Sequence, residues 1–204
     1  MNNFSTRRLV QTAVALLFAA SASLAFAGAS QPFPENLSFD EAGVTHELVL
    51  TGEAERVVLI FRVYDIAHYT EQAHYYDLSP ESVVADGPSK AIVINFARKL
   101  SKNQIRDEFD KSLRKNAEPE WLEAAGPTID RFVNAIDRDT NEGDQLVFYW
   151  LEGGQVFTDF NGERAFEVDD EAFAKLVWSI WFGAEPACDR DELLARSATA
   201  IADD

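Results

Sequence analysis

The sequence predicts an α+β fold in which helices cover one face of a large, mainly antiparallel sheet. Segments rich in β-branched and aromatic residues occur early and late in the chain, and the stretch between them has apolar residues at helical spacing. Asn161-Gly162 separates two of the late segments. An Asn-Gly pair between strands is the strongest short signal for an antiparallel hairpin.

The early part of the domain is expected to hold two strands. Residues 31–37 contain prolines and read as an irregular lead-in, and residues 44–51 alternate between apolar and polar as a half-buried strand does. Residues 52–55 read as a turn. Residues 56–69 are β-branched and aromatic, which predicts one long central strand. By alternation, and without a bulge, one face of that strand carries Arg56, Arg62, Tyr64 and His68.

The middle of the chain predicts a strand and then two helical stretches. Residues 91–97 are strand-like. Residues 100–113 then carry apolar side chains at helical spacing, with Ser101 as the expected N-cap. A second helical pattern spans residues 121–138, and Gly126-Pro127 is expected to break or kink it.

The last third predicts a three-stranded meander followed by helices. Asn161-Gly162 supplies its second turn, because a type I′ turn needs two residues with positive φ. Asp169 or Asp170 is expected to cap an amphipathic helix that ends at Gly183, and residues 189–200 suggest a short acidic helix. The strand-like segments are residues 145–151, 155–160 and 163–168.

The N-terminus has the pattern of a secretory signal peptide. Arg7 and Arg8 precede an apolar stretch, and Ala25-Phe26-Ala27 is a small-x-small cleavage site. A membrane span is the alternative, but a span needs about 20 strongly apolar residues, and polar residues interrupt this stretch. We therefore expect a signal peptide at residues 1–27, cleavage near Ala27, one domain at residues 28–204, and a periplasmic or secreted protein without a transmembrane span.

The charge of the chain argues against a nucleic-acid partner, and its single cysteine argues against a disulfide. The chain has 35 acidic and 18 basic residues, for a formal net charge of −17. Such a surface repels nucleic acid and anionic lipid head groups, so we expect no nucleic-acid partner.

Cys188 is the only cysteine, so no intramolecular disulfide can form. Its neighbours Glu185, Asp189 and Asp191 should raise its pKa, which favours a packing role over a reactive thiol.

The residues offer one candidate binding site and no candidate metal or cofactor site. The three histidines are not at metal-ligand spacing, and no phosphate-binding glycine motif or nucleophile elbow occurs. Arg56, Arg62 and Tyr64 remain, on the predicted central strand. A guanidinium and a phenol over an apolar cleft suit a carboxylate or phenolate on an apolar body. The alternative is that this face is open to solvent and its arginines pair with nearby acids.

Several short motifs, in order and over most of the domain, resemble those of the chalcone isomerase-like family, in particular its bacterial exported (periplasmic) branch. LTGEAER (residues 50–56), FRVY (61–64) and AHY (67–69) resemble the opening of that branch. IWFG (180–183), followed by Pro186 and Leu193-Leu194, resembles its end. The resemblance implies an open-faced β-sandwich of the chalcone isomerase type, with a ligand cleft between a large sheet and a helical layer.

The resemblance also implies roles for single residues. Arg56 matches the arginine that holds the substrate anion in the family's enzymes, and Tyr64 approximately matches a threonine. Three further polar positions of those enzymes, a tyrosine, an asparagine and a late hydroxyl residue, align with Ile105, Ser112 and Ala174. Because cyclising a chalcone needs an oriented phenolate and donors aimed at the developing enolate, we do not expect that activity here.

Three hypotheses about function remain open. The first is a non-catalytic exported protein that binds a small amphipathic anion, such as a fatty acid, through Arg56 with help from Tyr64. The second is an isomerase, or intramolecular lyase, acting on an unknown substrate. The third is an interaction module whose cleft is filled by its own side chains, with Trp150, Trp178 and Trp181 as candidates for the filling.

Overall fold

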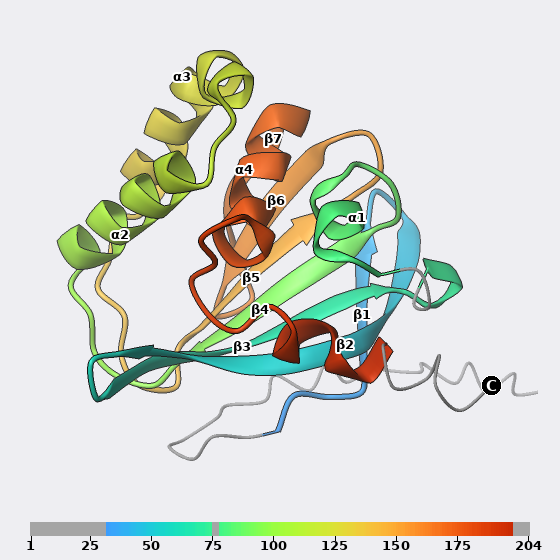
Figure 1. Ribbon diagram of the computed structural model, residues 1–204, viewed down its shortest axis with the longest axis horizontal. Coiled ribbons are helices and arrows are strands. Elements are labelled where there is room, and N and C mark those ends of the chain that lie inside the picture. The colour runs from blue at the N-terminus through green and yellow to red at the C-terminus, as the bar shows by residue number, and fades with distance from the viewer. Residues whose placement is uncertain (1–31, 75–77, 198–204) are drawn as a thin grey trace, which may run out of the picture.

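The computed structural model describes residues 32–74 and 78–197. They form a seven-stranded antiparallel sheet in which the strands lie in chain order, with helices on one face (Figure 1). The predicted signal peptide falls outside the described residues. Within them, no helix is both long and apolar enough to cross a membrane. The strands are β1 (Asn36–Glu41), β2 (Val44–Val58), β3 (Phe61–Glu71), β4 (Lys90–Phe96), β5 (Gln145–Trp150), β6 (Gln155–Phe160) and β7 (Glu163–Asp169).

The early part differs from the sequence prediction. The lead-in gives way to strand β1, and the predicted turn at residues 52–55 lies inside β2, which runs to Val58. Gly52 is needed there for close approach, because a Cβ on it would lie 2.1 Å from the backbone oxygen of Glu192. The short C-terminal 3₁₀ helix Glu192–Leu194 therefore packs directly on the strand. The rest of the acidic helix expected at residues 189–200 lies partly outside the described residues.

The predicted single strand over residues 56–69 is a hairpin. The chain reverses at Leu59 and Ile60, where Val58 of β2 pairs with Phe61 of β3. Leu59 has a φ of 60°. Glycine and asparagine usually take that conformation, so the residue types at this position did not predict a turn. A register shift between Arg56 and Val57 also interrupts the alternation of side chains.

The helices are α1 (Pro80–Val84), α2 (Lys102–Lys115), α3 (Pro119–Ala135) and α4 (Glu171–Phe182). Ser101 caps α2 as predicted, and its hydroxyl and the side chain of Gln104 form a reciprocal capping box. Gly126-Pro127 was predicted to break or kink the helix; it does not break it, because α3 continues through Pro127. That proline costs one backbone hydrogen bond, but the helix buries an apolar face that includes Ile129 and Phe132.

The late meander forms as predicted. Asn161 and Gly162 have φ values of 51° and 80° and join β6 to β7. The carboxylate of Asp170 accepts a hydrogen bond from the backbone N–H of Phe173 and caps α4, which ends at Gly183. Buried apolar side chains occupy most of α4, which packs against α1, α2 and α3. This helix is therefore the centre of the helical layer.

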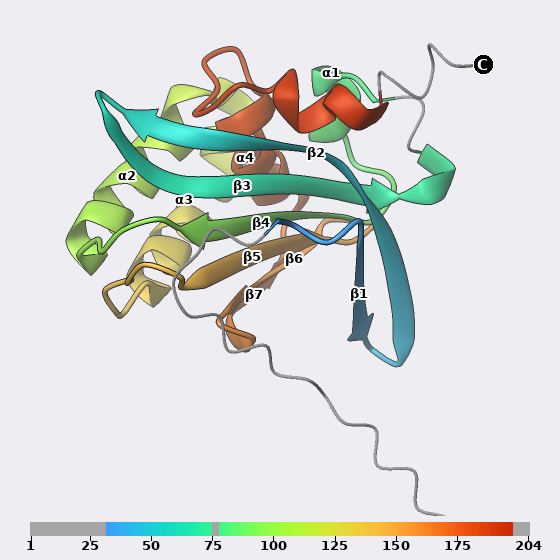
Figure 2. The ribbon, with the colours of Figure 1, turned by 90° about the horizontal axis from the view of Figure 1, so that it is seen from below.

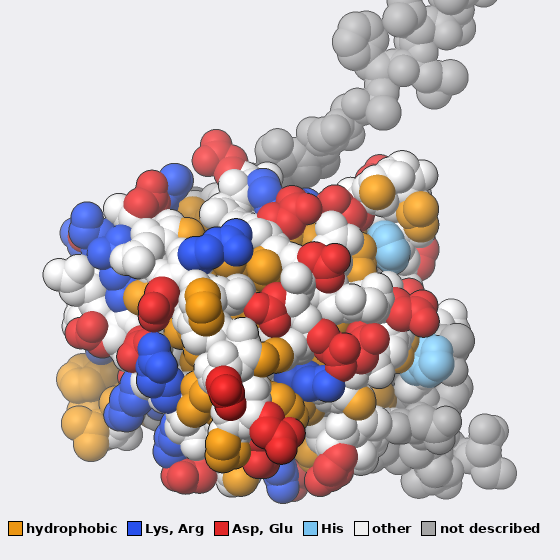
Figure 3. Space-filling view, turned by 90° about the horizontal axis from the view of Figure 1, so that it is seen from above, with side chains coloured by type: hydrophobic (Ala, Val, Ile, Leu, Met, Phe, Trp, Pro, Cys, Tyr) orange, Lys and Arg blue, Asp and Glu red, His pale blue; other side chains and the backbone are white. Residues whose placement is uncertain are grey.

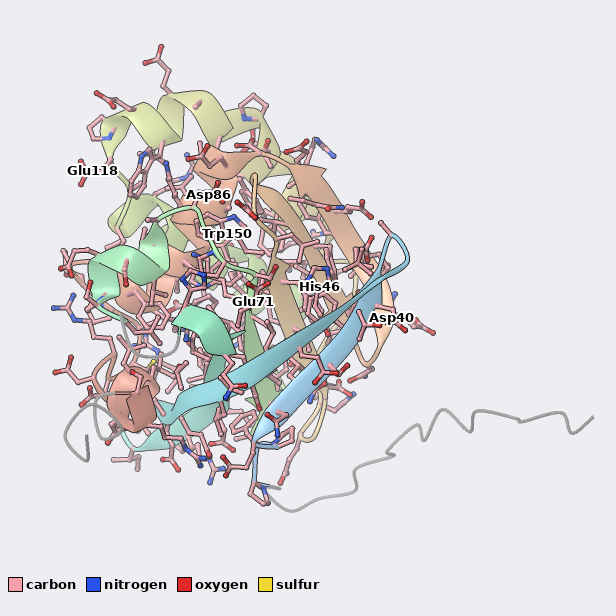
Figure 4. The ribbon with its side chains drawn as sticks, turned by 90° about the vertical axis from the view of Figure 1, so that its right-hand side faces the viewer. Asp40, His46, Glu71, Asp86, Glu118 and Trp150 are labelled. Atoms are coloured by element: carbon pink, nitrogen blue, oxygen red, sulfur yellow. The ribbon has the colours of Figure 1, made fainter. Side chains whose placement is uncertain are left out.

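The sheet is curled, so both of its faces carry a core. On the helical side, Trp150 of β5 meets Trp178 of α4 edge to face, with ring centroids 5.2 Å apart. Trp150 lies between the sheet and the helices, whereas Asp40 and His46 lie on the β1–β2 hairpin (Figure 4). On the other side Phe39 of β1 packs on Tyr149 at 4.4 Å between ring centroids. The edge strands β1 and β7 thereby come close enough for a 2.8 Å ion pair between Glu41 and Arg164.

Candidate functional site

A cavity of about 470 Å³ opens between the β2–β3 hairpin and helix α2. Cavities of this size hold small organic ligands. Its floor is the helical face of β4, and α4 closes its inner side. The lining is mainly apolar. It includes Arg56, Val58, Leu59, Phe61, Tyr64, Ile94, Phe96, Arg98, Ile105, Asp107, Glu108, Phe109, Lys111, Ser112 and Trp181.

Arg56 lies at the rim of this cavity. One of its terminal nitrogens donates a hydrogen bond to the carbonyl oxygen of Ala187 at 2.5 Å, and the other donates to a carboxylate oxygen of Glu108 at 3.2 Å. Its side chain is 27 % exposed and that of Glu108 is 55 % exposed. The carbonyl fixes the orientation of the guanidinium. The exposed Glu108 carboxylate is a weak partner that an incoming anion can replace.

Tyr64 lies beside Arg56, because the two residues are paired across β2 and β3. Its hydroxyl oxygen accepts a hydrogen bond from the indole N–H of Trp181 at 3.0 Å. Burial raises the pKa of this phenol far above its usual range, so it stays protonated. The hydroxyl donates no hydrogen bond to any of the described residues, so Tyr64 can donate its hydrogen to a ligand.

Arg62 does not reach the cavity. It forms ion pairs with Asp65 and with Glu55, the latter at 3.7 Å. Glu55 and Asp65 are paired across the strands, next to the pair of Arg56 and Tyr64, so their side chains point to the opposite face. The prediction that Arg62 shares a face with Arg56 and Tyr64 is therefore wrong. The turn and the register shift, neither visible in the sequence, are the cause.

Of the three positions that the resemblance aligns with polar residues of the family's enzymes, two line the cavity and one does not. Ile105 and Ser112, which the sequence resemblance aligns with a tyrosine and an asparagine of the family's enzymes, line the cavity from α2. Ala174 is fully buried in α4 and does not line the cavity. The body of the cavity is apolar. Apart from Arg56, its charged residues, among them Arg98, Lys111 and Asp107, come from the connection before α2 and from α2 itself.

A second cavity of about 180 Å³ adjoins the first. Phe96, Ile105 and Phe109 line both, so these three side chains form the partition. Phe109 also meets Phe132 edge to face at 5.3 Å between ring centroids. Thr140 is one of the residues that line this smaller cavity, and its buried hydroxyl has no hydrogen-bond partner among the described residues.

The tryptophans proposed to fill the cleft do not close it. Trp150 and Trp178 are fully buried in the core, and Trp181 forms one wall of the larger cavity. The space in front of Trp181 remains open, which removes the support for a module with a filled cleft.

The other titratable residues considered in the sequence analysis, His68 and Cys188, are buried and partly buried, respectively, and pack within the fold. His68 is fully buried against Phe182, and burial, followed by the charge of Lys90, lowers its pKa to about 3. The pKa of Cys188 is raised to about 12, as predicted in direction, but burial is the main cause. Asp189 contributes less, and Arg56 acts in the opposite sense. No group of three metal-ligating side chains occurs in the described part of the chain.

The comparisons with known proteins agree with this geometry. The profile of a family described as chalcone isomerase-like matches residues 27–195. The crystal structure of a fatty-acid binding protein from Arabidopsis thaliana is similar in fold, with a TM-score of 0.60 and 13 % identity over 80 % of this chain and 98 % of that one. No curated protein sequence matches. The fold is thus the α+β sandwich of the chalcone isomerase type, and the chain belongs to the chalcone isomerase-like family.

Proposed function

We propose that this protein binds a small amphipathic anion, with a fatty acid as the leading candidate, in the cavity beside Arg56. One observation carries the proposal. A fixed guanidinium and a neutral phenol lie together at the rim of an open cavity whose body is apolar. A carboxylate on a hydrocarbon chain has the complementary chemistry, since its anion needs charged and directional donors and its chain needs apolar surface.

The local contacts suit exchange of partners. Arg56 needs no movement to meet a carboxylate, because the Ala187 carbonyl already holds one arm of its guanidinium. The ligand carboxylate replaces Glu108 at the other terminal nitrogen of Arg56. The binding free energy from this contact is therefore only the difference between two charge-assisted hydrogen bonds. Burial of the chain against residues such as Ile94, Phe96 and Ile105 then supplies most of the affinity.

The structural relative supports the choice of ligand class. The Arabidopsis protein of similar fold is a fatty-acid binding protein. In the present chain, Ile105 and Ser112 replace the polar groups that the family's enzymes use, while Arg56 is retained. This pattern favours holding an anion over transforming it.

The test is displacement of a fluorescent fatty acid from the purified, delipidated protein by unlabelled acids of increasing chain length. We expect saturable binding that Arg56→Gln weakens about tenfold or more, the cost of one charge-assisted hydrogen bond. Arg62→Gln is the matched control, an arginine on the same hairpin that faces away, and it should bind like the wild type. Wild-type protein that binds no fatty acid, or equal losses in both variants, would refute the proposal.

We also propose that the protein acts in the periplasm or outside the cell after cleavage near Ala27. The support is the charged, apolar and small-x-small pattern of residues 1–27. Expression of the full chain in a bacterial host, followed by fractionation and intact mass measurement, tests it. We expect a mature form beginning at residue 28 in the periplasm or medium, and retention of the uncleaved chain in the cytoplasm would contradict it.

A further inference from the structure

The tip of the β2–β3 hairpin carries the main exposed apolar cluster of the described residues. We call residues 57–61 the hairpin tip; they are Val57, Val58, Leu59, Ile60 and Phe61. Every one of these side chains is at least 45 % exposed, and Leu59 and Ile60 reach 90 % and 84 %. The tip projects beyond the ends of β4 and β5 (Figure 2). Five consecutive apolar residues without a cover are a signature of an interaction site.

The form of the tip indicates what kind of partner covers it. Neighbouring residues of a strand point to opposite faces, so apolar side chains project from both faces of the hairpin. A flat protein partner would cover one face only. A lipid layer surrounds an inserted tip on all sides, and a depth of about 5–10 Å is usual for segments that lie at the head-group boundary.

Charge near the tip points to the same partner. The connection from β4 to α2 leaves the sheet beside the hairpin, where the N–H of Ala97 donates to the carbonyl of Val63 at 3.0 Å. Between Phe96 and Asp107 the chain carries four basic residues and no acidic one. The guanidinium of Arg98 lies 5.1 Å from the ring centroid of Phe61. Arg98, Lys102 and Lys111 form no ion pair with any residue that the structure describes.

This local charge is the reverse of the overall charge. In a chain with a net charge of −17, most of the surface is repelled by an anionic membrane. Figure 3 shows apolar side chains protruding at the lower left, with Lys and Arg side chains beside them. The repulsion of the rest of the surface would therefore orient the molecule with this end toward the lipid.

We propose that the hairpin tip docks on the surface of an anionic lipid bilayer. Val58, Leu59 and Phe61 also line the ligand cavity, so docking places the cavity mouth at the membrane surface. An amphipathic ligand then passes between bilayer and cavity without its chain crossing water. The docking itself does not depend on the proposed ligand, and it is measured with delipidated protein and no added fatty acid, so either proposal can fail alone.

The backbone offers a favourable test variant. Because Leu59 has a positive φ, asparagine suits its conformation better than leucine does. The double variant Leu59→Asn/Ile60→Thr should therefore fold as stably as the wild type, which thermal unfolding checks. The matched control is Val44→Thr, which makes polar an apolar side chain that is 56 % exposed at the opposite end of β2.

Co-sedimentation with vesicles measures the docking. We expect the wild type to bind vesicles of phosphatidylglycerol and phosphatidylcholine more tightly than pure phosphatidylcholine, and less tightly as salt rises. The double variant should lose at least tenfold in affinity and Val44→Thr none. Lys99→Gln/Lys102→Gln should weaken binding to anionic vesicles about fivefold or more.

Two results would overturn the proposal. One is a wild type that does not bind the anionic vesicles, or a double variant that binds them as the wild type does. The other is sedimentation velocity showing a wild-type dimer that the double variant converts to a monomer. In that case a second copy of the chain, and not lipid, covers the tip.

Discussion

Lowering the pH from 7.5 to 5 should destabilise the fold through His68. The ring is fully buried, one nitrogen lies 2.7 Å from the hydroxyl of Thr51, and the other has no partner among the described residues. Burial lowers its pKa to about 3, whereas in the unfolded chain the pKa of the ring has its ordinary value of 6.5. The unfolded state therefore takes up a proton as the pH falls below 6.5, while the folded state stays neutral down to about 3.

The size of the effect follows from that difference. At pH 5 the proton bound by the unfolded state favours unfolding by about 2 kcal/mol, and each further unit down to pH 3 adds about 1.4 kcal/mol. Stability associated with His68 is thus complete above pH 6.5 and is lost on the way down to pH 3. A loss of this size is a substantial part of the stability of an ordinary domain.

Urea unfolding followed by tryptophan fluorescence at pH 7.5 and pH 5 measures this loss. His68→Asn keeps an amide near Thr51 but cannot titrate, so it should lose about 2 kcal/mol less than the wild type over this range. Contributions from carboxylates are common to both proteins and cancel in the difference. Equal losses in both proteins would refute the assignment of acid sensitivity to this histidine.

Further predictions concern the cavity and the sheet. Glu108→Gln removes the anion that competes for Arg56, so a displacement assay should show about two- to fivefold tighter binding of a fatty acid and no change for its methyl ester; weaker binding of the acid would contradict the exchange of partners. Phe109→Ala opens the partition between the two cavities, so the protein should prefer fatty acids with a longer chain than the wild type does. An unchanged preference for chain length would show that the second cavity is not part of the binding site. Gly52→Ala forces a Cβ into the C-terminal 3₁₀ helix and should lower the free energy of unfolding by about 3 kcal/mol. Gly126→Ala, which has open space around it, should instead stabilise α3 by up to about 1 kcal/mol. Chemical unfolding measures both, and similar effects of the two substitutions would be inconsistent with the packing.

The parts of the fold that the sequence predicted are those with a local cause. Asn161-Gly162 marks its turn because few other residue pairs accept two positive φ angles. Ser101 and Asp170 mark helix starts because a side-chain oxygen there satisfies a backbone N–H. These signals depend on one or two neighbours in the chain, so they can be read without the tertiary structure.

The parts that the sequence missed have non-local causes. Leu59 and Ile60 form a turn that their residue types disfavour, because the pairing of β2 with β3 imposes it. Gly52 looked like a turn residue, but its small size serves the approach of a segment about 140 positions later in the chain. The same turn explains the site: Arg56 and Tyr64 come together across two strands, while Arg62 faces away.

A structure of the protein with a bound fatty acid tests the binding proposal most directly. We predict that the carboxylate lies within hydrogen-bonding distance of the guanidinium of Arg56 and the hydroxyl of Tyr64, with Glu108 displaced and the chain in the apolar cavity. A carboxylate bound at Arg62 or elsewhere on the surface, with the cavity beside Arg56 empty, would contradict it.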